Sequence, residues 1–172
     1  MSEETANYDP EPTYIVEPPK SAPRVKIKKL HPDAVIPTKA TPQSACYDVY
    51  APCDFIVKPG RSVMPLGLAI ELPIGYAAEI RSRSGYSSKG FAGKFDVSEY
   101  RFDADVHAGV VDADFRQGIG VILKSCETRP FTILKGQRVA QMLIIKAETV
   151  DFEESDSLSE TERHGGFGHT GI

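Results

Sequence analysis

Residues 62–80 read SVMPLGLAIELPIGYAAEI, and this stretch decides the fold class. Two apolar runs, 62–72 and 76–80, flank the turn signal LPIG, in which proline and glycine interrupt regular structure. Further runs rich in Val, Ile and Leu occupy 118–123 and 137–145. No window of twelve or more residues carries a helical period with caps. Many short strands separated by Gly and Pro predict an all-β fold, a jelly-roll-like β-sandwich or barrel.

Length and composition bound the size of the fold and its compartment. The chain has 172 residues and 41% hydrophobic content, enough for one domain with a core. Its net charge of −4, with Lys and Arg scattered, argues against direct nucleic-acid binding. Cys46, Cys53 and Cys126 form no CxxC pair, which is typical of a reducing compartment. With no visible secretory leader and no apolar run near ~20 residues, we expect an intracellular protein without a membrane span, either cytoplasmic, nuclear or viral.

Composition divides the chain into three parts. Residues 1–24 hold five prolines and five acidic residues and predict an extended, poorly ordered tail, with a docking motif as the alternative. Residues 25–152 carry the β pattern. The last part, 153–172, begins with a polar, acidic linker over 153–162 that is long enough to carry the end of the chain away from its own sheet.

The C-terminal end reads RHGGFGHTG over residues 163–171. Glycine N–H groups can surround phosphate oxygens, Arg163 can pair with charge, and Phe167 offers a flat face for a base. Such a segment can close over an anionic ligand. Considered alone, it is equally compatible with a loose polar tail.

Three internal segments carry side chains suited to chemistry. Residues 45–51 (ACYDVYA) alternate along a strand and hold one carboxylate, Asp48, which could also serve as a turn or capping residue. Residues 81–85 (RSRSG) gather guanidinium, hydroxyl and backbone donors for phosphate, although a solvated turn has the same composition. Residues 108–116 (AGVVDADFR) lead into a turn with two carboxylates, for which an exposed Asp-rich β-turn is the alternative.

Taken in order, these segments resemble the motifs of the trimeric, all-β dUTPase family (dUTP nucleotidohydrolases) over residues 25–171. The five matching segments are 45–51, 83–85 (RSG), 109–115 (GVVDADF), 136–141 (GQRVAQ) and 166–171 (GFGHTG). The related dCTP deaminases usually have Arg-Ser-Ser in the second motif, so Gly85 favours the dUTPase side. The resemblance implies hydrolysis of dUTP to dUMP and pyrophosphate, which keeps uracil out of DNA and supplies dUMP for thymidylate synthesis.

The resemblance also implies roles for individual residues. Asp112 would activate the water that attacks the α-phosphorus. Mg²⁺ would be bound chiefly by phosphate oxygens and water, with Asp48 acting on it indirectly through water. The residues that would bind the phosphate chain come from the second and fourth motifs and the C-terminal end: Arg83, Ser84, Gly85, Gln141, Arg163, Gly168, His169 and Thr170.

Selection of base and sugar follows from the same resemblance. The backbone of a β-hairpin that includes Gly109, Val110 and Val111 would pair with the uracil edge. Phe115, where the family most often has Tyr, would pack under the deoxyribose and exclude a 2′-hydroxyl. Phe167 would stack on the uracil. The family forms homotrimers in which each site takes motifs one, two and four from one chain, motif three from a second and the C-terminal arm from a third.

The sequence departs from the family pattern in three places. The separation between Arg83 and Asp112 is longer than usual, and the excess falls within 89–105, which could form a lid, a partner-binding loop or an inert surface hairpin. His169 stands where the family usually has Ser. Arg163 lies one residue closer to Phe167 than the phosphate-binding Arg of the family does. The alternative function is therefore a regulatory protein on the same fold, which binds a protein partner through this insertion or the N-terminal tail.

Overall fold

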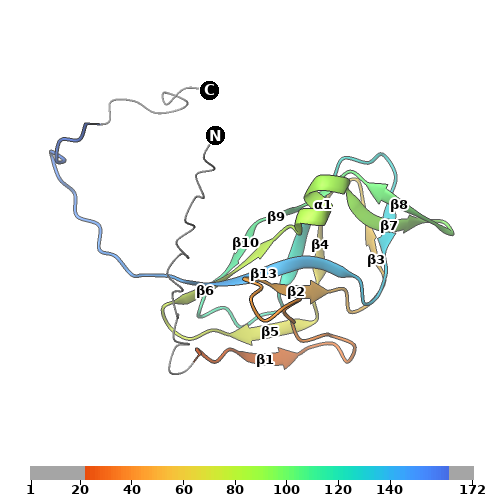
Figure 1. Ribbon diagram of the computed structural model, residues 1–172, viewed down its shortest axis with the longest axis horizontal. Helices are drawn as coiled ribbons and strands as arrows, with labels where there is room; N and C mark the ends of the chain where they lie inside the picture. Colours follow the sequence, from red (N-terminus) through yellow and green to blue (C-terminus); the bar gives the residue numbers. More distant parts are fainter. Residues whose placement is uncertain (1–21, 163–172) are drawn as a thin grey trace, which may run out of the picture.

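The computed structural model describes residues 22–162 (Figure 1). The expectations for residues 1–21, and those for Arg163, Phe167, Gly168, His169 and Thr170, lie outside the described residues. Within 22–162, no helix combines the length and the apolar character that crossing a bilayer would need.

Thirteen strands and one short helix make up the described part of the chain. In chain order they are β1 (Lys26–Lys29), β2 (Tyr47–Tyr50), β3 (Phe55–Val57), β4 (Gly60–Pro65), β5 (Leu68–Glu71), β6 (Tyr76–Arg81), α1 (Ser84–Lys89), β7 (Phe91–Phe95), β8 (Ser98–Phe102), β9 (Ala104–His107), β10 (Gly109–Val111), β11 (Gly120–Ser125), β12 (Phe131–Ile133) and β13 (Arg138–Lys146).

The strands form four small antiparallel sheets that close around one core. Their orders are β10-β6-β13-β2, β4-β11-β9, β3-β12-β7-β8 and β1-β5. Neighbours in a sheet often lie far apart in the sequence, as with β2 and β13, and Figure 1 shows β13 crossing the middle of the domain. This arrangement confirms the predicted all-β, jelly-roll-like fold.

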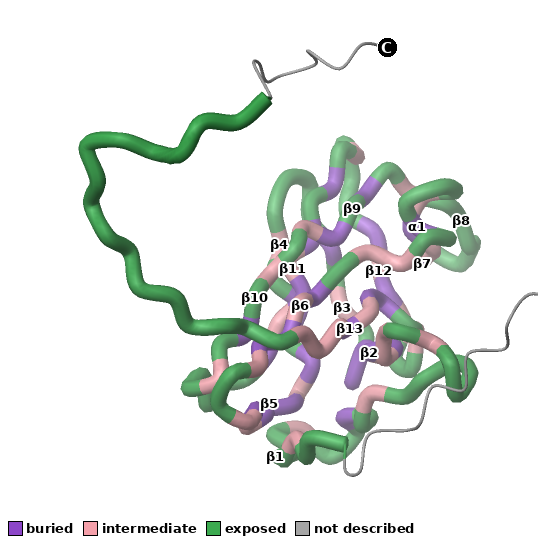
Figure 2. The backbone as a smooth tube through the Cα atoms, turned by 60° about the vertical axis from the view of Figure 1, so that its left-hand side comes forward, coloured by how far each residue is buried: buried purple, intermediate pink, exposed green. Residues whose placement is uncertain are grey.

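The core follows from the alternation of side chains along the strands. In β11, Val121 and Leu123 are fully buried, whereas Ile122 between them is half-buried and Lys124 after them is exposed. Successive residues of a strand face opposite sides of the sheet, so one face of β11 supplies core and the other is available for solvent or a partner. Figure 2 shows the buried positions gathered inside the domain and the chain after β13 leaving it as an exposed segment that runs to residue 162.

The apolar run 62–72 is divided into β4 and β5 at Gly67, which has a φ of +66°. A Cβ added at Gly67 would lie 2.7 Å from the Cβ of His31, so both the backbone conformation and the close approach require glycine. The sequence predicts strand structure here but not the break, because the break depends on a contact with a distant residue.

The predicted insertion at 89–105 contains the β7–β8 hairpin, which turns at Asp96 and Val97. Its inner strand is part of the core, since Phe91 is fully buried and Gly93 lies against the Phe131 ring. Helix α1 precedes the hairpin and was not predicted, because six residues are too few to show a helical period.

Candidate active site

The first, second and fourth predicted motifs lie side by side on one sheet. Gln141 of β13 pairs with Asp48 of β2 on one side and with Arg81 of β6 on the other. Neighbouring strands lie about 4.8 Å apart, so these three residues form a short row across the sheet. The end of β6 then leads directly into residues 83–85.

A β-bulge in β13 decides which side chains lie beside Asp48. The register shifts between Arg138 and Ala140, and the two consecutive residues Val139 and Ala140 are both fully buried. In a regular strand, residues three apart point to opposite faces. The extra residue at the bulge lets Arg138 and Gln141 both flank the Asp48 carboxylate.

Two arginines hold the Asp48 carboxylate. The Nε of Arg83 donates to Oδ1 over 3.0 Å, and the Nη1 of Arg138 donates to Oδ2 over 3.3 Å. Asp48 is 8% exposed, and a buried carboxylate requires such partners. With both oxygens engaged, the three groups carry one net positive charge, which suits the binding of an anion.

The segment 82–85 is fixed to the sheet by Gln141. The Nε2 of Gln141 donates to the carbonyl oxygen of Ser82 over 2.9 Å, and the hydroxyl of Ser87 donates to that of Ser82 over 3.0 Å. These bonds orient the chain where it leaves β6 and enters α1. Ser84 and Gly85, both exposed, therefore lie next to the Arg83–Asp48 pair.

A cavity of about 530 Å³ opens at this place, and we call it the Asp48 cavity. Its lining residues come from the loop before β2, from β2, from the start of α1 and from β13: Ala40, Ser44, Ala45, Cys46, Asp48, Arg83, Ser84, Gly85 and Gln141. Five of the residues predicted from the first, second and fourth motifs thus line one hollow.

The third predicted motif lies elsewhere on the same sheet. Gly109, Val110 and Val111 form β10, which pairs with β6 and is the outer strand of its sheet. Asp112 follows at the surface, in a turn where the N–H of Phe115 donates to the carbonyl oxygen of Asp112 over 3.1 Å. Phe115 is 39% exposed, so its ring is available to a ligand or a partner chain.

Strand register gives the separation between Asp112 and the Asp48 cavity. Val111 pairs with Ala78 of β6, three residues before the position that pairs with Gln141, which is roughly 10 Å along the strand. Three strand spacings from β10 to β2 add roughly 14 Å across the sheet. The two places are therefore roughly 17 Å apart within one chain, too far for both to contact the same phosphate.

Sequence reasoning left out three residues that matter at the site. Arg138 is the first residue of β13. A single cationic residue at the start of an apolar strand is a sequence signal that could have identified it. Cys46 lines the Asp48 cavity as a free, half-buried thiol. Tyr86 is the buried residue of α1 and contacts both arginine-bearing segments, which no local pattern reveals.

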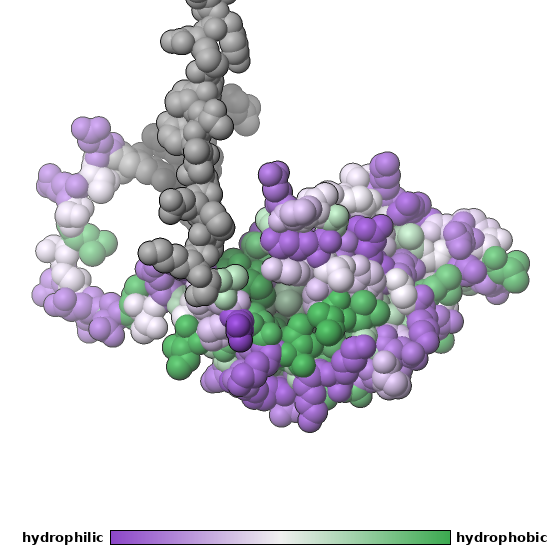
Figure 3. Space-filling model, turned by 60° about the horizontal axis from the view of Figure 1, so that its bottom comes forward, coloured by the Kyte–Doolittle hydropathy of each residue, from purple (hydrophilic) through white to green (hydrophobic). Residues whose placement is uncertain are grey.

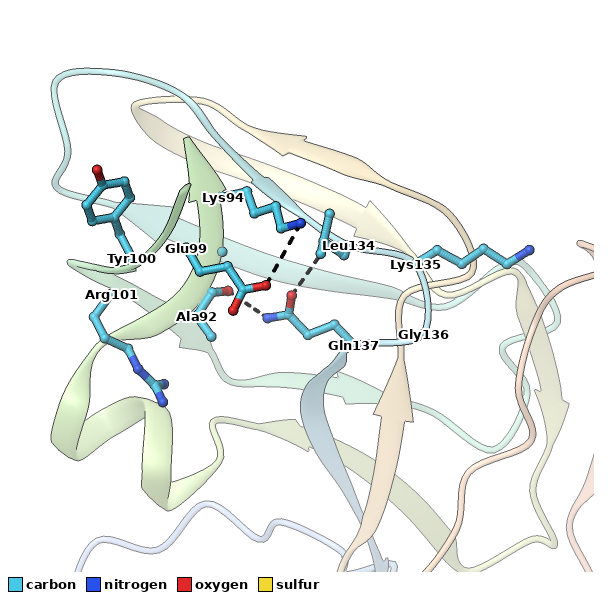
Figure 4. A pocket seen from close by; sticks show the side chains of 10 residues that line it. Ala92, Lys94, Glu99, Tyr100, Arg101, Leu134, Lys135, Gly136 and Gln137 are labelled. Atoms are coloured by element: carbon cyan, nitrogen blue, oxygen red, sulfur yellow. Dashed lines mark hydrogen bonds and ion pairs between the residues drawn. The ribbon is translucent and has the colours of Figure 1, made fainter. Parts of the chain in front are cut away.

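A second cavity, of about 770 Å³, lies between the β7–β8 hairpin and the turn before β13, and we call it the hairpin cavity. Figure 4 shows Gln137 at its centre, with the Lys94 and Glu99 side chains of the hairpin facing it. It is lined by Ala92, Gly93, Lys94, Glu99, Tyr100, Arg101, Leu134, Lys135, Gly136 and Gln137. This cavity belongs to the insertion and was not predicted.

Residues 22–162 contain no group of three or more His, Cys, Asp or Glu side chains arranged to hold a metal ion. Each Asp48 oxygen accepts a hydrogen bond from an arginine, which reduces the capacity of this carboxylate to bind a metal ion directly. A metal at this site would have to be bound mainly by ligand oxygens and water, which suits a hard ion such as Mg²⁺.

The dUTPase family model matches residues 32–171, a range that includes the Asp48 cavity and the third motif. The chain belongs to the dUTPase family. The deoxyuridine 5'-triphosphate nucleotidohydrolase of Arabidopsis thaliana is 40% identical over 153 residues, 88% of this chain and 85% of the plant protein. The protein of that name from Anaplasma marginale is 41% identical over 140 residues, 79% of this chain and 88% of its own length.

Solved dUTPase structures share the fold. The dUTPase of Staphylococcus bacteriophage 80alpha with dUPNHPP superposes with a TM-score of 0.75 at 22% identity, covering 87% of this chain and 99% of the phage chain. A point mutant of the dUTPase from phage phi11 of S. aureus, described as coordinating a structural Mg(II) ion, gives a TM-score of 0.66 at 19% identity, with 78% and 97% covered. At 22% and 19% identity, these two comparisons show that the phage dUTPases and this chain share a fold.

Proposed function

We propose that this chain hydrolyses dUTP to dUMP and pyrophosphate. The observation that carries the proposal is the Asp48 cavity. It gathers Arg83, Ser84, Gly85 and Gln141 around a carboxylate whose negative charge is offset by arginine. Guanidinium, hydroxyl and amide donors in one hollow match the oxygens of a phosphate chain. The curated relatives named deoxyuridine 5'-triphosphate nucleotidohydrolase support the same substrate.

Asp112 is the proposed general base. Its carboxylate takes a proton from a water molecule, and the oxygen of that water attacks the α-phosphorus of dUTP. The bond from this phosphorus to the bridging oxygen of the β-phosphate breaks, and pyrophosphate leaves. A positioned base of this kind typically contributes about 10²–10⁴-fold to the rate. Arg83, Ser84, Gly85 and Gln141 are proposed to hold the phosphate chain, with contacts that are made in the ground state as in the transition state.

Magnesium fits the proposed site as an ion that arrives with the triphosphate. Asp48 would act on it through water, since its oxygens bond to Arg83 and Arg138. When bound, Mg²⁺ neutralises charge on the phosphate chain. The phi11 structure described with a Mg(II) ion supports the choice of metal.

The third motif is proposed to select the base and the sugar. Because β10 is an outer strand, the N–H and C=O groups on its free side are available to pair with the uracil edge. We propose that Gly109, Val110 and Val111 supply these groups. Phe115, half-exposed at the end of the turn, is proposed to pack under the deoxyribose.

We propose a homotrimer in which neighbouring chains complete each site. The separation of roughly 17 Å between Asp112 and the Asp48 cavity supports this, because a second chain can bring its Asp112 to the cavity. Apolar surface is also available for association: Figure 3 shows apolar residues gathered on the face that holds β1 and β5, and Ile27, Leu30 and Ile36 are among the exposed ones.

The C-terminal segment is proposed to close over the site of a third chain. The exposed stretch that follows β13 carries the chain away from its own sheets, which supports such a reach. Arg163, Gly168, His169 and Thr170 are proposed to contact the phosphates, and Phe167 to stack on the uracil. These five residues lie outside the described part of the chain.

The test of this function is pyrophosphate release with Mg²⁺ present from dUTP, compared with dCTP, UTP and dTTP. We expect turnover of dUTP and little of the other three. UTP tests the crowding by Phe115, and dCTP tests the pairing with β10. No turnover of dUTP would refute the proposal.

A second function, docking of a protein partner on the β7–β8 hairpin, is favoured by one observation. β8 is the outer strand of its sheet, so one side of its backbone is free to pair with an extended peptide. Val97 at the tip of the hairpin is 92% exposed. A proline at Glu99 or Arg101 would block strand pairing on the free side of β8 while leaving dUTP turnover in place. Unchanged binding of a confirmed partner would refute this mode.

A further inference from the structure

Tyr86 lies between the Asp48 cavity and the β7–β8 hairpin. Its side chain is buried, and its ring stacks on Phe91 of β7 with 4.1 Å between centroids. The guanidinium carbon of Arg83 lies 5.5 Å from the centre of the same ring, a cation–π distance. The Tyr86 hydroxyl donates to the carbonyl oxygen of Arg138. Tyr86 therefore contacts both residues whose guanidinium groups hold Asp48.

Gln137 connects the hairpin to Tyr86. Its Nε2 donates to the carbonyl oxygen of Ala92 over 2.6 Å and to the Tyr86 hydroxyl over 3.3 Å. Its Oε1 accepts from the N–H of Leu134 over 3.3 Å. Figure 4 shows the amide between the hairpin and the turn before β13, with its bonds to Ala92 and Leu134 drawn. A single amide thus joins β7, α1 and the start of β13.

The contacts form one continuous path from the hairpin to the site. It runs from Ala92 through Gln137 and the Tyr86 hydroxyl to the Arg138 backbone, and from the Arg138 side chain to Asp48. Arg138 stands at the edge of the β-bulge, where the ladder to β2 is irregular. A carbonyl at such a place is held less firmly by its own sheet, so the Tyr86 hydroxyl has a direct influence on where Arg138 lies.

We propose that Tyr86 and Gln137 are positioning residues that hold Arg83, Asp48 and Arg138 in the geometry that binds the phosphate chain. The insertion then supports the site indirectly, because Phe91 stacks on Tyr86 and the carbonyl oxygen of Ala92 accepts from Gln137. This inference rests on the proposed function of the Asp48 cavity. It gives the insertion a supporting role on the side of the site away from the substrate, which differs from a lid that covers the substrate and from an inert surface hairpin.

The proposal predicts a particular kinetic effect. Tyr86→Phe keeps the ring on Phe91 and under Arg83 and removes only the hydroxyl. Phosphate contacts made equally in the ground state and the transition state affect KM and leave kcat unchanged. We therefore expect KM for dUTP to rise about three- to tenfold, the size expected for one lost buried hydrogen bond, with kcat within about twofold of the wild-type value.

The experiment measures steady-state kinetics and the Kd for dUpNHpp for the wild-type chain, Tyr86→Phe and Gln137→Met. Gln137→Met keeps the length of the side chain and removes both polar atoms. Because both residues act on the same contact, the KM increase in the double variant should be smaller than the product of the two single increases. Tyr100→Phe, which removes a hydroxyl from a half-exposed ring of the same hairpin, is the matched control and should leave KM unchanged.

A KM for Tyr86→Phe equal to that of Tyr100→Phe would overturn the proposal and leave dUTP hydrolysis standing. A loss confined to kcat would also overturn it, as would single effects that multiply fully. If Gln137→Met fails to fold, Tyr86→Phe alone decides the question. If the wild-type chain does not turn over dUTP, the proposed function fails, and the Kd for dUpNHpp is compared in place of KM. Absence of dUpNHpp binding by the wild-type chain would overturn both proposals.

Discussion

Arg83 donates from its Nε to the Oδ1 of Asp48 over 3.0 Å, so the second predicted motif is bonded to the first. The pair is completed by Arg138, which occupies the other carboxylate oxygen. A phosphate chain that enters the cavity therefore meets Arg83, which lines the cavity and whose position is already fixed by Asp48. Fixed donors lose little conformational freedom on binding, and this raises affinity.

Replacing Asp48 with asparagine should weaken both the fold and the site. The amide keeps the shape but removes the charge that offsets Arg83 and Arg138. Because both arginines are partly exposed, we expect the free energy of unfolding in urea to fall by only about 1–2 kcal/mol. Misplaced arginines should also lower kcat/KM by about tenfold or more. Glu71→Gln, which breaks the exposed pair with Lys26, is the control. An equal loss of stability in the two variants would contradict this account.

Asp112→Asn should separate chemistry from binding and from folding. Asp112 is exposed, so its replacement should leave the free energy of unfolding unchanged. Loss of the base should lower kcat by about 10²–10⁴-fold, while the Kd for dUpNHpp changes little. Asp114→Asn, two residues along the same turn, should retain most of the activity. Near-full activity in Asp112→Asn would show that another group activates the water.

Mixing two inactive variants should restore activity if sites are shared between chains. In trimers assembled at random from Asp112→Asn and Arg83→Ala chains, an intact site needs Arg83 from one type and Asp112 from the other. With equal amounts, about a quarter of the sites meet this condition, so activity should return to about a quarter of the wild-type value. The measurement requires co-expression or joint refolding, so that the chains mix. A mixture as inactive as its components would place Asp112 and Arg83 in the same chain's site.

The parts of the site that follow from short sequence segments could be predicted, and those that depend on register could not. Asp48, Arg83 and Gln141 were recognisable because each stands in a short segment that resembles a dUTPase motif, and the structure places them on one cavity. The bulge at Val139 could not be predicted, because it exists only in the pairing of β13 with β2. Tyr86 carried no signal either, since its partners come from β7 and β13.

Acid should remove a small, identifiable part of the stability. The hydrogen bond and charge of Lys135 hold the pKa of Asp33 below its ordinary value of 3.8. A carboxyl whose pKa is lower in the folded state stabilises the fold above its unfolded pKa, and this stabilisation is lost as pH falls through the folded pKa. Asp33→Asn should therefore reduce the loss of stability between pH about 5 and pH about 2, measured by urea unfolding at each pH. An unchanged pH profile would rule out the ion pair as a contributor.

Two glycine-to-alanine variants should affect different properties. One should lower the stability of the fold, and the other should raise KM for dUTP. A Cβ at Gly93 would lie 2.6 Å from Cδ2 of Phe131 and 3.0 Å from the carbonyl oxygen of Thr132, so Gly93→Ala should cost about 1–3 kcal/mol of stability. A Cβ at Gly85 would meet nothing within 4 Å in the described part of the chain, so Gly85→Ala should leave the free energy of unfolding unchanged or slightly raised. At the proposed phosphate site, however, the added methyl group would prevent close approach of an oxygen to the backbone, and KM for dUTP should rise. Urea unfolding and steady-state kinetics on both variants check this, and a normal KM in Gly85→Ala would remove Gly85 from the phosphate-binding set.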